Sequence, residues 1–358
     1  MASPDEPRAA VGIPAGRRES TGRLPGREKE SMITVRGLAR RFTARGHSVE
    51  AVKGIDFDVA PGEVVGFLGP NGAGKTTTLR MLTTLLRPTG GTGTVAGCDL
   101  LTDPQGVRRR IGCVQQGGAG WPESRVAEEI ELQARLYGLS RSEARRRGAL
   151  LTERLDLADL DQRAVKTLSG GQRRRLDIAL GLVHEPMLVF LDEPTTGLDP
   201  QSRANLWDHV RRLRSEQGTT VFLTTHYLDE ADALCDRILV TDHGTIVAEG
   251  TPDALKARVA GDAVTIEVTD RAAEAADVAG RLAGATEVSV DGDTVRFRVP
   301  RGDAALPELL RTLDSRGITM ASIKINRPTL DDVFLSLTGR SLRDGDPAPR
   351  TGEAAHAA

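Results

Sequence analysis

The pattern of apolar positions predicts a sheet domain over residues 32–255. Within it, the run 63–68 predicts a strand, and the runs 187–191 and 220–223 are apolar throughout. Unbroken apolar runs of this length are typical of parallel strands that are buried on both faces. The stretch 75–86 instead places leucines on one side of a helix. Strands that alternate with helices predict an α/β fold.

A helical subdomain is predicted inside this sheet domain, at about residues 117–180. That stretch is mostly helical in pattern and rich in Arg, Glu and Leu. The two ends of the chain differ, because residues 1–31 and 341–358 show no apolar period. Segments of this composition cannot bury enough apolar surface to fold. We therefore expect a disordered leader and a disordered tail.

A small α+β domain is predicted over residues 262–340. Strands are expected at 263–269, 286–290, 294–299 and 318–325, and helices at 271–282 and 303–313. The order β-α-β-β-α-β is the ferredoxin-like plan. Thr329 then caps a short helix that runs through Leu337, with Asp332 as its acidic capping partner.

The overall composition suits a soluble globular protein, with 39% hydrophobic and 27% charged residues. The net charge of -2 provides no positive field to attract nucleic acid. Apolar runs fall far short of the ~18–20 residues of a membrane helix, so a partner must supply any membrane span. The three cysteines are far apart, which supports neither a disulfide framework nor a zinc site and favours a reducing cytoplasm.

A glycine-rich loop between the predicted strand 63–68 and the predicted helix 75–86 fits the phosphate-binding pattern GxxxxGK followed by Ser or Thr. Its glycines let backbone N–H groups converge on phosphate oxygens. Lys75 supplies a point charge for the terminal phosphates, and the Thr76 hydroxyl can bind Mg²⁺. The alternative is a glycine-rich turn with an incidental lysine, which the position between strand and helix disfavours. The candidate nucleotide-binding residues here are Gly69, Pro70, Asn71, Gly72, Ala73, Gly74, Lys75, Thr76 and Thr77.

Two carboxylates end the predicted strand 187–191. Asp192 can hold Mg²⁺ through water, and Glu193 can polarise the water that attacks the phosphate. The alternative is a strand that ends in acidic turn residues. The phosphate-binding loop earlier in the chain favours the catalytic interpretation.

A Ser-Gly-Gly-Gln turn precedes a predicted helix at 173–182. Ser169, Gly170, Gly171 and Gln172 therefore form a second helix N-terminus that could face phosphate. The alternative is an ordinary capped helix start. The position of the turn, between the phosphate loop and the acidic strand end, favours the phosphate interpretation.

With these motifs in this order, residues 33–250 closely resemble the ABC ATPases. The resemblance implies that Gln116 senses Mg²⁺ and faces a transport partner, and that His226 is the switch histidine that contacts the γ-phosphate. It also implies a D-loop role for Asp199. Phe42 stands where the family has an aromatic that stacks on adenine, and the alternative is a core aromatic.

A narrower resemblance extends into the second domain. The segments 173–179, 224–231 and 328–335 together look like the daunorubicin-resistance type of drug-exporter ATPase. In that group a separate permease spans the membrane. The resemblance implies efflux of a hydrophobic or amphiphilic drug-like compound, powered by Mg²⁺ and ATP at the cytoplasmic face of the membrane.

The family resemblance also implies a head-to-tail dimer of ATPase subunits. Each ATP would lie between Lys75 of one chain and Ser169–Gly171 of the other, with Glu193 as the base. Two alternatives are a soluble ABC protein that serves translation or DNA, and a drug-sequestering protein with a vestigial ATPase. The first alternative predicts a second ATPase domain in tandem or a long coiled coil, and the sequence shows neither. Intact Glu193 and His226 argue against the second alternative.

Overall fold

The computed structural model describes residues 31–44, 47–115, 120–259 and 261–340. The disordered leader and tail predicted at the two ends of the chain lie outside these residues, apart from Ser31. The described part contains three sheets. No helix in these ranges has both the length and the apolar character of a membrane span.

A six-stranded, mainly parallel sheet forms the centre of the first domain, in the order β10-β9-β3-β8-β7-β6. Its strands are β3 (Val64–Leu68), β6 (Ile111–Val114), β7 (Leu188–Asp192), β8 (Thr220–Thr225), β9 (Arg237–Asp242) and β10 (Thr245–Gly250). Every residue of β3, β7 and β8 is buried, which explains why these strands are apolar runs rather than alternating patterns. The three strands expected from those runs are confirmed.

A second, antiparallel sheet packs against the first, in the order β2-β1-β4-β5. It consists of β1 (Ile33–Ala44), β2 (His47–Val59), β4 (Gly90–Val95) and β5 (Cys98–Asp99). The core between the sheets contains the rings of Phe57, Phe67 and Phe222, whose centroids lie 5.8–6.3 Å apart. The helices α1 (Lys75–Leu82) and α2 (Pro104–Arg110) belong to this part of the chain.

Helix α1 is shorter than the pattern of leucines predicts. The sequence places its end at Leu86, but the helix ends at Leu82 and Thr83 is its C-cap. Thr84 has a φ of 61°, in the left-handed region that interrupts a right-handed helix. The backbone of the following turn therefore breaks the helix while the apolar spacing continues.

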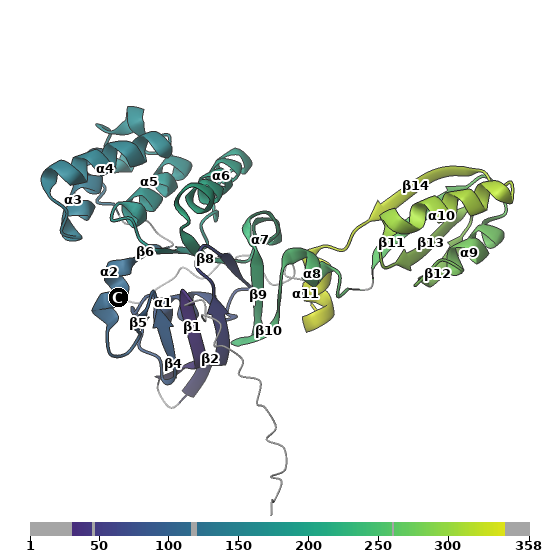
Figure 1. Ribbon diagram of the computed structural model, residues 1–358, viewed down its shortest axis with the longest axis horizontal. Helices are drawn as coiled ribbons and strands as arrows, with labels where there is room; N and C mark the ends of the chain where they lie inside the picture. The colour runs from purple at the N-terminus through teal and green to yellow at the C-terminus, as the bar shows by residue number, and fades with distance from the viewer. Residues whose placement is uncertain (1–30, 45–46, 116–119, 260, 341–358) are drawn as a thin grey trace, which may run out of the picture.

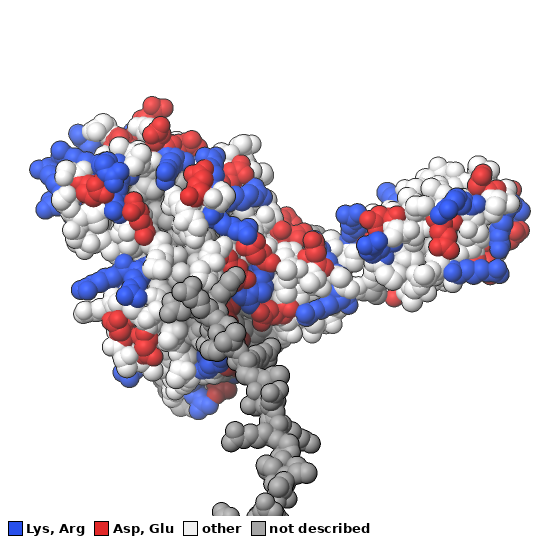
Figure 2. Space-filling model, viewed as in Figure 1, with Lys and Arg blue, Asp and Glu red and all other residues white. Residues whose placement is uncertain are grey.

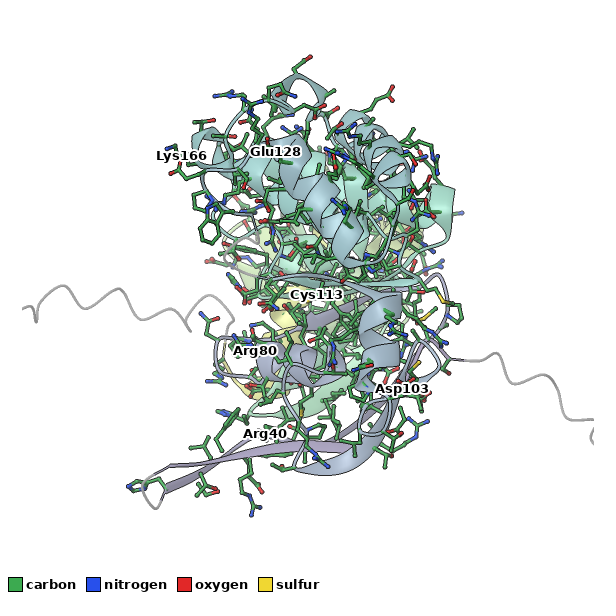
Figure 3. All side chains as sticks on the ribbon, turned by 90° about the vertical axis from the view of Figure 1, so that its left-hand side faces the viewer. Arg40, Arg80, Asp103, Cys113, Glu128 and Lys166 are labelled. Atoms are coloured by element: carbon green, nitrogen blue, oxygen red, sulfur yellow. The ribbon has the colours of Figure 1, made fainter. Side chains whose placement is uncertain are left out.

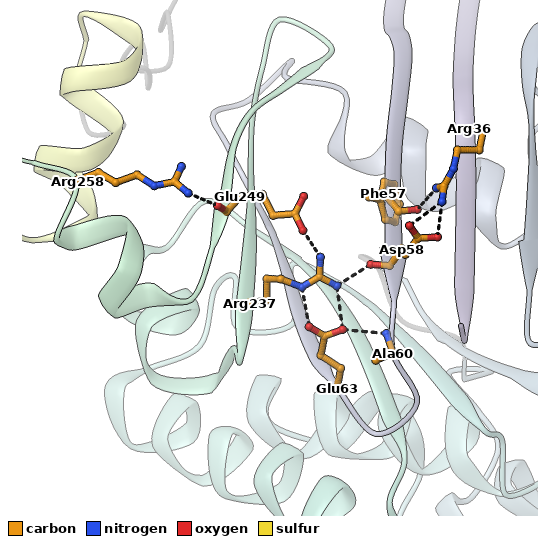
Figure 4. Close-up of polar contacts among 8 residues, drawn as sticks. All are labelled: Arg36, Phe57, Asp58, Ala60, Glu63, Arg237, Glu249 and Arg258. Atoms are coloured by element: carbon orange, nitrogen blue, oxygen red, sulfur yellow. Dashed lines mark hydrogen bonds and ion pairs between the residues drawn. The ribbon is translucent and has the colours of Figure 1, made fainter. Parts of the chain in front are cut away.

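An ion-pair cluster around Arg237 joins strands from both sheets (Figure 4). The guanidinium of Arg237 binds the Glu63 carboxylate through two hydrogen bonds, of 2.7 and 2.9 Å. It also donates to the carboxylate of Glu249 on β10 and to the carbonyl of Asp58 on β2. These hydrogen bonds raise the pKa of Arg237. The cluster fixes β9 relative to β2, β10 and the residue that precedes β3.

Helices form a separate layer beside the central sheet (Figures 1 and 3). They are α3 (Val126–Leu136), α4 (Arg141–Arg154), the short 3-10 turns η1 (Ala158–Leu160) and η2 (Val165–Thr167), α5 (Gly170–Leu182) and α6 (Pro200–Gln217). In Figure 3, Glu128 and Lys166 lie in this layer, Arg40 and Asp103 lie among the sheets, and Cys113 of β6 lies between them. The elements from α3 to α5 correspond to the predicted helical subdomain.

The last part of the chain forms a third sheet that stands apart from the other two (Figure 1). It contains β11 (Asp262–Val268), α9 (Ala272–Gly280), β12 (Thr286–Asp291), β13 (Thr294–Val299), α10 (Gly302–Ser315) and β14 (Met320–Asn326). The strands pair antiparallel in the order β12-β13-β11-β14. This β-α-β-β-α-β arrangement confirms the ferredoxin-like expectation, and a core of its own holds it together.

The final described helix, α11 (Leu330–Thr338), belongs to a different core from the sheet that precedes it. Thr329 and Asp332 form the predicted capping box. The side chains of Leu330, Val333 and Phe334 are buried in the core of the first domain, beside α7 (Leu228–Leu234) and α8 (Pro252–Lys256). The chain therefore returns to the first domain after the third sheet, which the predicted bounds of 262–340 do not anticipate.

Candidate functional site

The glycine-rich loop follows the carboxyl end of β3 and leads into α1. Gly72 and Gly74 have φ values of 82° and 98°, which L residues with side chains rarely adopt. A Cβ atom on Gly74 would lie 2.5 Å from the carbonyl oxygen of Ala51, and one on Gly69 would lie 2.3 Å from that of Thr241. The glycines are therefore required by backbone conformation and by close approach of neighbouring strands.

Lys75 begins α1 and is only 5% exposed. Its Nζ donates to the carbonyl oxygens of Gly69 (2.8 Å) and Pro70 (3.1 Å). It also lies 3.4 Å from Oε1 of Glu193. Burial lowers the pKa of Lys75, whereas the nearby carboxylate raises it. The ammonium is thus held inside the loop, where it can exchange these partners for phosphate oxygens.

Asp192 lies at the end of β7 and accepts hydrogen bonds from two hydroxyls. Its Oδ1 is 2.6 Å from Oγ1 of Thr224 and 3.3 Å from Oγ1 of Thr76. A carboxylate and a hydroxyl at one point fit Mg²⁺, which takes few protein oxygens together with phosphate oxygens and water. Among the described residues, no group of three or more His, Cys, Asp or Glu could hold a metal by itself.

Glu193 follows with a φ of 44°, which turns the chain sharply after β7. Its Oε1 lies 3.2 Å from Nδ1 of His226, the residue that follows β8. The pKa of Glu193 falls to about 2, chiefly through its hydrogen bond with His226 and with help from Lys75, although burial opposes the shift. Thr196 donates to the other carboxylate oxygen at 3.3 Å. Without nucleotide, Glu193 is therefore an ionised carboxylate held between two cationic or donor groups.

These groups meet at one open cavity of about 560 Å³. The cavity is lined by Ala51, Asn71, Gly72, Gly74, Lys75, Thr76, Thr77, Glu193, Thr196, His226 and Tyr227. It thus brings the predicted phosphate-binding loop together with the predicted base and switch residues, which lie more than a hundred positions further along the sequence. The site lies where the carboxyl ends of β3, β7 and β8 meet, the usual place for ligands in α/β sheets.

The Ser-Gly-Gly-Gln turn lies elsewhere in the chain's own structure. Ser169 caps α5 by accepting from the N–H of Gln172 at 3.2 Å, and the Gln172 side chain accepts from the N–H of Ser169 at 2.9 Å. The helix therefore begins at Gly170, earlier than the predicted start at residue 173, because the capping box takes Gly170 and Gly171 into its first turn. Ser169 and Gly170 are exposed, and none of these four residues lines the cavity.

The other predicted site residues are distributed around this cavity rather than in it. Phe42 is 40% exposed, so the alternative of a core aromatic is wrong. The centroid of its ring lies 4.7 Å from the guanidinium carbon of Arg40. Phe42 is absent from the cavity lining. Asp199 caps α6 and accepts from the N–H of Ser202 at 2.8 Å. Gln116 lies outside the described residues.

The site also contains three residues that the sequence motifs do not identify. Thr224 holds Asp192, Tyr227 lines the cavity, and Arg174 of α5 donates to the backbone beside Glu193. A signal for Thr224 exists, since a hydroxyl at the end of a buried parallel strand points to the shared edge of the sheet. Arg174 stands among three consecutive arginines, and only the packing of α5 distinguishes it.

Comparison with known proteins agrees with this geometry. A family model described as ABC transporter matches residues 52–196, and one described as the C-terminal domain of DrrA1-3-like ATP-binding proteins matches residues 250–338. Daunorubicin resistance ATP-binding protein DrrA3 of Streptomyces coeruleorubidus is 46% identical, across 88% of this chain and 98% of its own. Daunorubicin/doxorubicin resistance ATP-binding protein DrrA of Streptomyces peucetius is 45% identical, across 87% and 94%.

Solved structures give the same result for the fold. A dimeric post-hydrolysis state of the ATP-binding cassette MJ0796, bound to ADP and Pi, matches with a TM-score of 0.58 and 26% identity, over 62% of this chain and 98% of that one. The fold and the cavity define a nucleotide-binding ABC ATPase. The chain belongs to the ATP-binding proteins of ABC transporters, in the group of the daunorubicin-resistance proteins. It is the ATP-hydrolysing subunit of an exporter.

Proposed function

We propose that this chain drives the efflux of a hydrophobic or amphiphilic drug-like compound through a separate permease, as one half of a head-to-tail dimer at the cytoplasmic face of the membrane. The observation that carries the proposal is the separation of two phosphate-binding features. The cavity contains Lys75, whereas the exposed start of α5 at Ser169 lies outside it. Both the cavity and the start of α5 are accessible to a second copy of this chain.

ATP binding in this proposal begins with the loop that contains Lys75. The N–H groups of the loop and of the first turn of α1 attract the phosphates, and Lys75 moves from the carbonyls of Gly69 and Pro70 to the terminal phosphates. Thr76, Asp192 and Gln116 would hold Mg²⁺, which when bound neutralises charge on the phosphates. Phe42 stacks on adenine.

Hydrolysis in this proposal uses Glu193 as the base. A carboxylate with a pKa of about 2 is a weak base. When Lys75 turns toward ATP and the γ-phosphate brings negative charge, both changes raise the pKa of Glu193. The carboxylate can then take a proton from the attacking water, while His226 donates to the γ-phosphate. Bound ATP therefore makes the Glu193 carboxylate a stronger base toward the attacking water.

The dimer completes this site in the proposal. The exposed N-terminus of α5 offers free N–H groups and a favourable dipole to the phosphates held by Lys75 of the partner subunit. Ser169, Gly170 and Gly171 make this contact, and Gln172 holds the turn in place. Asp199, at the start of α6, lies at the same face of the dimer. ATP closes the two subunits, and hydrolysis lets them separate.

The permease contact is proposed on the helical layer. Large apolar side chains are exposed there, including Trp121 at 70%, Leu132 at 54% and Leu136 at 74%. Leu132 and Leu136 lie one turn apart on α3, and exposed apolar groups that lie side by side mark protein–protein contacts. Trp121 also lies close in sequence to Gln116, which the family resemblance assigns to the transport partner. Over the face in Figure 2, Lys and Arg are mixed with Asp and Glu, which suits a protein partner better than nucleic acid.

The test is co-expression with a candidate permease subunit, in cells loaded with daunorubicin. The chain should pellet with membranes only when the permease is present. Cells should then retain less drug, and Glu193→Gln should abolish that difference. Membrane pelleting without the permease, or drug retention that is unchanged by Glu193→Gln, would contradict the proposal.

A further inference from the structure

Arg174 connects α5 to the backbone on both sides of Glu193. Its side chain is buried, with the residue 9% exposed, although it carries a charge. Nη2 donates to the carbonyl oxygen of Asp192 at 2.9 Å, and Nε donates to that of Pro194 at 2.9 Å. Nη1 donates to the carbonyl of Gln115 at 2.7 Å. One guanidinium thus holds three main-chain carbonyls from two segments.

The backbone that Arg174 holds is strained. Glu193 has a φ of 44°, a conformation that residues with side chains adopt rarely and keep only where their surroundings impose it. The N–H of Glu193 donates to two oxygens of Thr224, the carbonyl oxygen and Oγ1, at 3.1 Å each. Arg174 restrains the carbonyls before and after Glu193. Together these contacts fix the direction in which the carboxylate leaves the chain.

The chemistry of this contact requires arginine. A guanidinium presents several N–H groups in a rigid planar fork, whereas an ammonium is a single point donor. Burial lowers the pKa of Arg174, and the carboxylates of Asp177 and Asp192 partly offset that cost. The neighbouring Arg175 differs, since its guanidinium lies 3.2 Å from the exposed carboxylate of Asp156. The two adjacent arginines therefore have separate partners.

We propose that Arg174 is a positioning residue that couples the start of α5 to the catalytic carboxylate of the same chain. The inference rests on the proposed composite site, in which Ser169–Gly171 contact the ATP of the partner subunit. Arg174 lies one turn further along that helix. ATP engaged by α5 at one site would then set the position of Glu193 at the other through the carbonyls of Asp192 and Pro194. The two sites of the dimer would be linked through one side chain.

The first experiment compares Arg174→Gln, Arg174→Lys and the matched control Arg175→Gln in steady-state ATP hydrolysis by the full chain. Arg174→Gln should lower kcat by about 10- to 100-fold, the scale expected when a catalytic group is misplaced, with little change in KM. It should also abolish any cooperativity in ATP. Arg174→Lys, which keeps a donor, should recover part of kcat. Arg175→Gln should stay within about twofold of wild type.

A double-mutant cycle separates positioning from general destabilisation. If Arg174 acts through Glu193, Arg174→Gln should cost almost nothing further in kcat when Glu193→Gln is already present. Thermal unfolding and binding of a fluorescent ATP analogue should show that Arg174→Gln remains folded and binds nucleotide. Equal losses of kcat in both backgrounds, or a loss shared by Arg175→Gln, would overturn the inference.

Light scattering with ATP distinguishes a failure of the Arg174 inference from a failure of the proposed dimer. Glu193→Gln should form an ATP-dependent dimer, and the Arg174→Gln/Glu193→Gln double variant should form it as well, since Arg174 itself does not contact the partner. No dimer in either variant would contradict the composite site. A dimer in Glu193→Gln alone would show that Arg174 supports the interface rather than Glu193, which would overturn the inference by itself.

Discussion

Nδ1 of His226 lies 3.2 Å from Oε1 of Glu193, although the two residues are 33 positions apart in the sequence. The two residues meet because β7 and β8 are adjacent parallel strands in which Asp192 pairs with Thr224. Each functional residue therefore leaves the sheet at the same edge. In the proposed mechanism, the Glu193 carboxylate and the His226 imidazole separate partly when the γ-phosphate enters between them.

The Glu193 carboxylate should make the stability of the nucleotide-free protein dependent on acid. Its pKa drops from 4.5 to about 2 on folding. A depressed pKa stabilises the folded state above the unfolded value, and this stabilisation is lost as pH falls toward the folded value. The contribution is on the order of 3 kcal/mol. Urea unfolding from neutral pH downward should therefore show a smaller acid-dependent loss for Glu193→Gln than for wild type. Identical losses would mean that the His226 and Lys75 contacts do not stabilise the fold.

Lys75→Ala should remove nucleotide turnover while leaving the fold intact. The substitution deletes the buried ammonium that the loop carbonyls of Gly69 and Pro70 hold ready. We expect hydrolysis to fall by at least about 100-fold, the usual effect of losing a group aimed at developing charge. Arg80→Ala is the matched control, because Arg80 is an exposed cation on the same helix (Figure 3). A similar loss in both variants would show that charge on α1, rather than the phosphate contact, sets the rate.

Much of the fold follows from the sequence because local and tertiary signals agree. The strands β3, β7 and β8 are apolar because they are buried on both faces, and the capping box of Thr329 and Asp332 is a local hydrogen-bond pattern. The end of α1 does not follow from the sequence, because the left-handed backbone at Thr84 leaves the apolar spacing unchanged. Element boundaries depend on such backbone details, which hydrophobic periodicity does not record.

The site divides in the same way. Residues within short motifs, such as Lys75 and Glu193, can be predicted from the sequence because their spacing along the chain encodes their chemistry. Arg174 cannot be distinguished from Arg173 and Arg175 by residue type, since its role depends on which side of α5 faces β7. The packing partner of helix α11 could not be predicted from the sequence either. Its position after the third sheet in sequence suggests that sheet as its partner, yet its apolar face lies against α7 and α8.

The core of the first domain should depend on this last helix. Phe334 is 1% exposed, whereas its neighbour Leu335 is 48% exposed. Phe334→Ala should lower the free energy of unfolding by about 3–5 kcal/mol, the cost of removing a buried aromatic ring. Leu335→Ala, the control, should change it by less than about 1 kcal/mol. Urea unfolding followed by intrinsic fluorescence measures both. Equal effects would place α11 outside the cooperative core.

Deletion of residues 262–326 with a short linker should leave ATP binding intact, because every predicted nucleotide contact lies upstream and α11 is retained. Deletion from 262 to the end of the chain should be more damaging, since it also removes Phe334 from the first core. The comparison is made by thermal unfolding and by binding of a fluorescent ATP analogue. Loss of nucleotide binding in the shorter deletion, with a folded circular dichroism spectrum, would show that the third sheet contributes to the site.

Glu193→Gln should trap an ATP-bound dimer that wild type forms only transiently. The substitution keeps the size of the side chain and its capacity for hydrogen bonds but removes the base, so ATP that closes the dimer is not consumed. It also removes negative charge next to Lys75, which frees that ammonium for phosphate. Light scattering with saturating ATP should therefore show a mass twice that of the monomer for the variant, and a monomer after addition of ADP alone. Ser169→Arg in the same background serves as the interface control, because a bulky cation at the exposed start of α5 would block the partner's phosphates. A dimer that persists in this double variant would place the interface elsewhere and would remove α5 from the composite site.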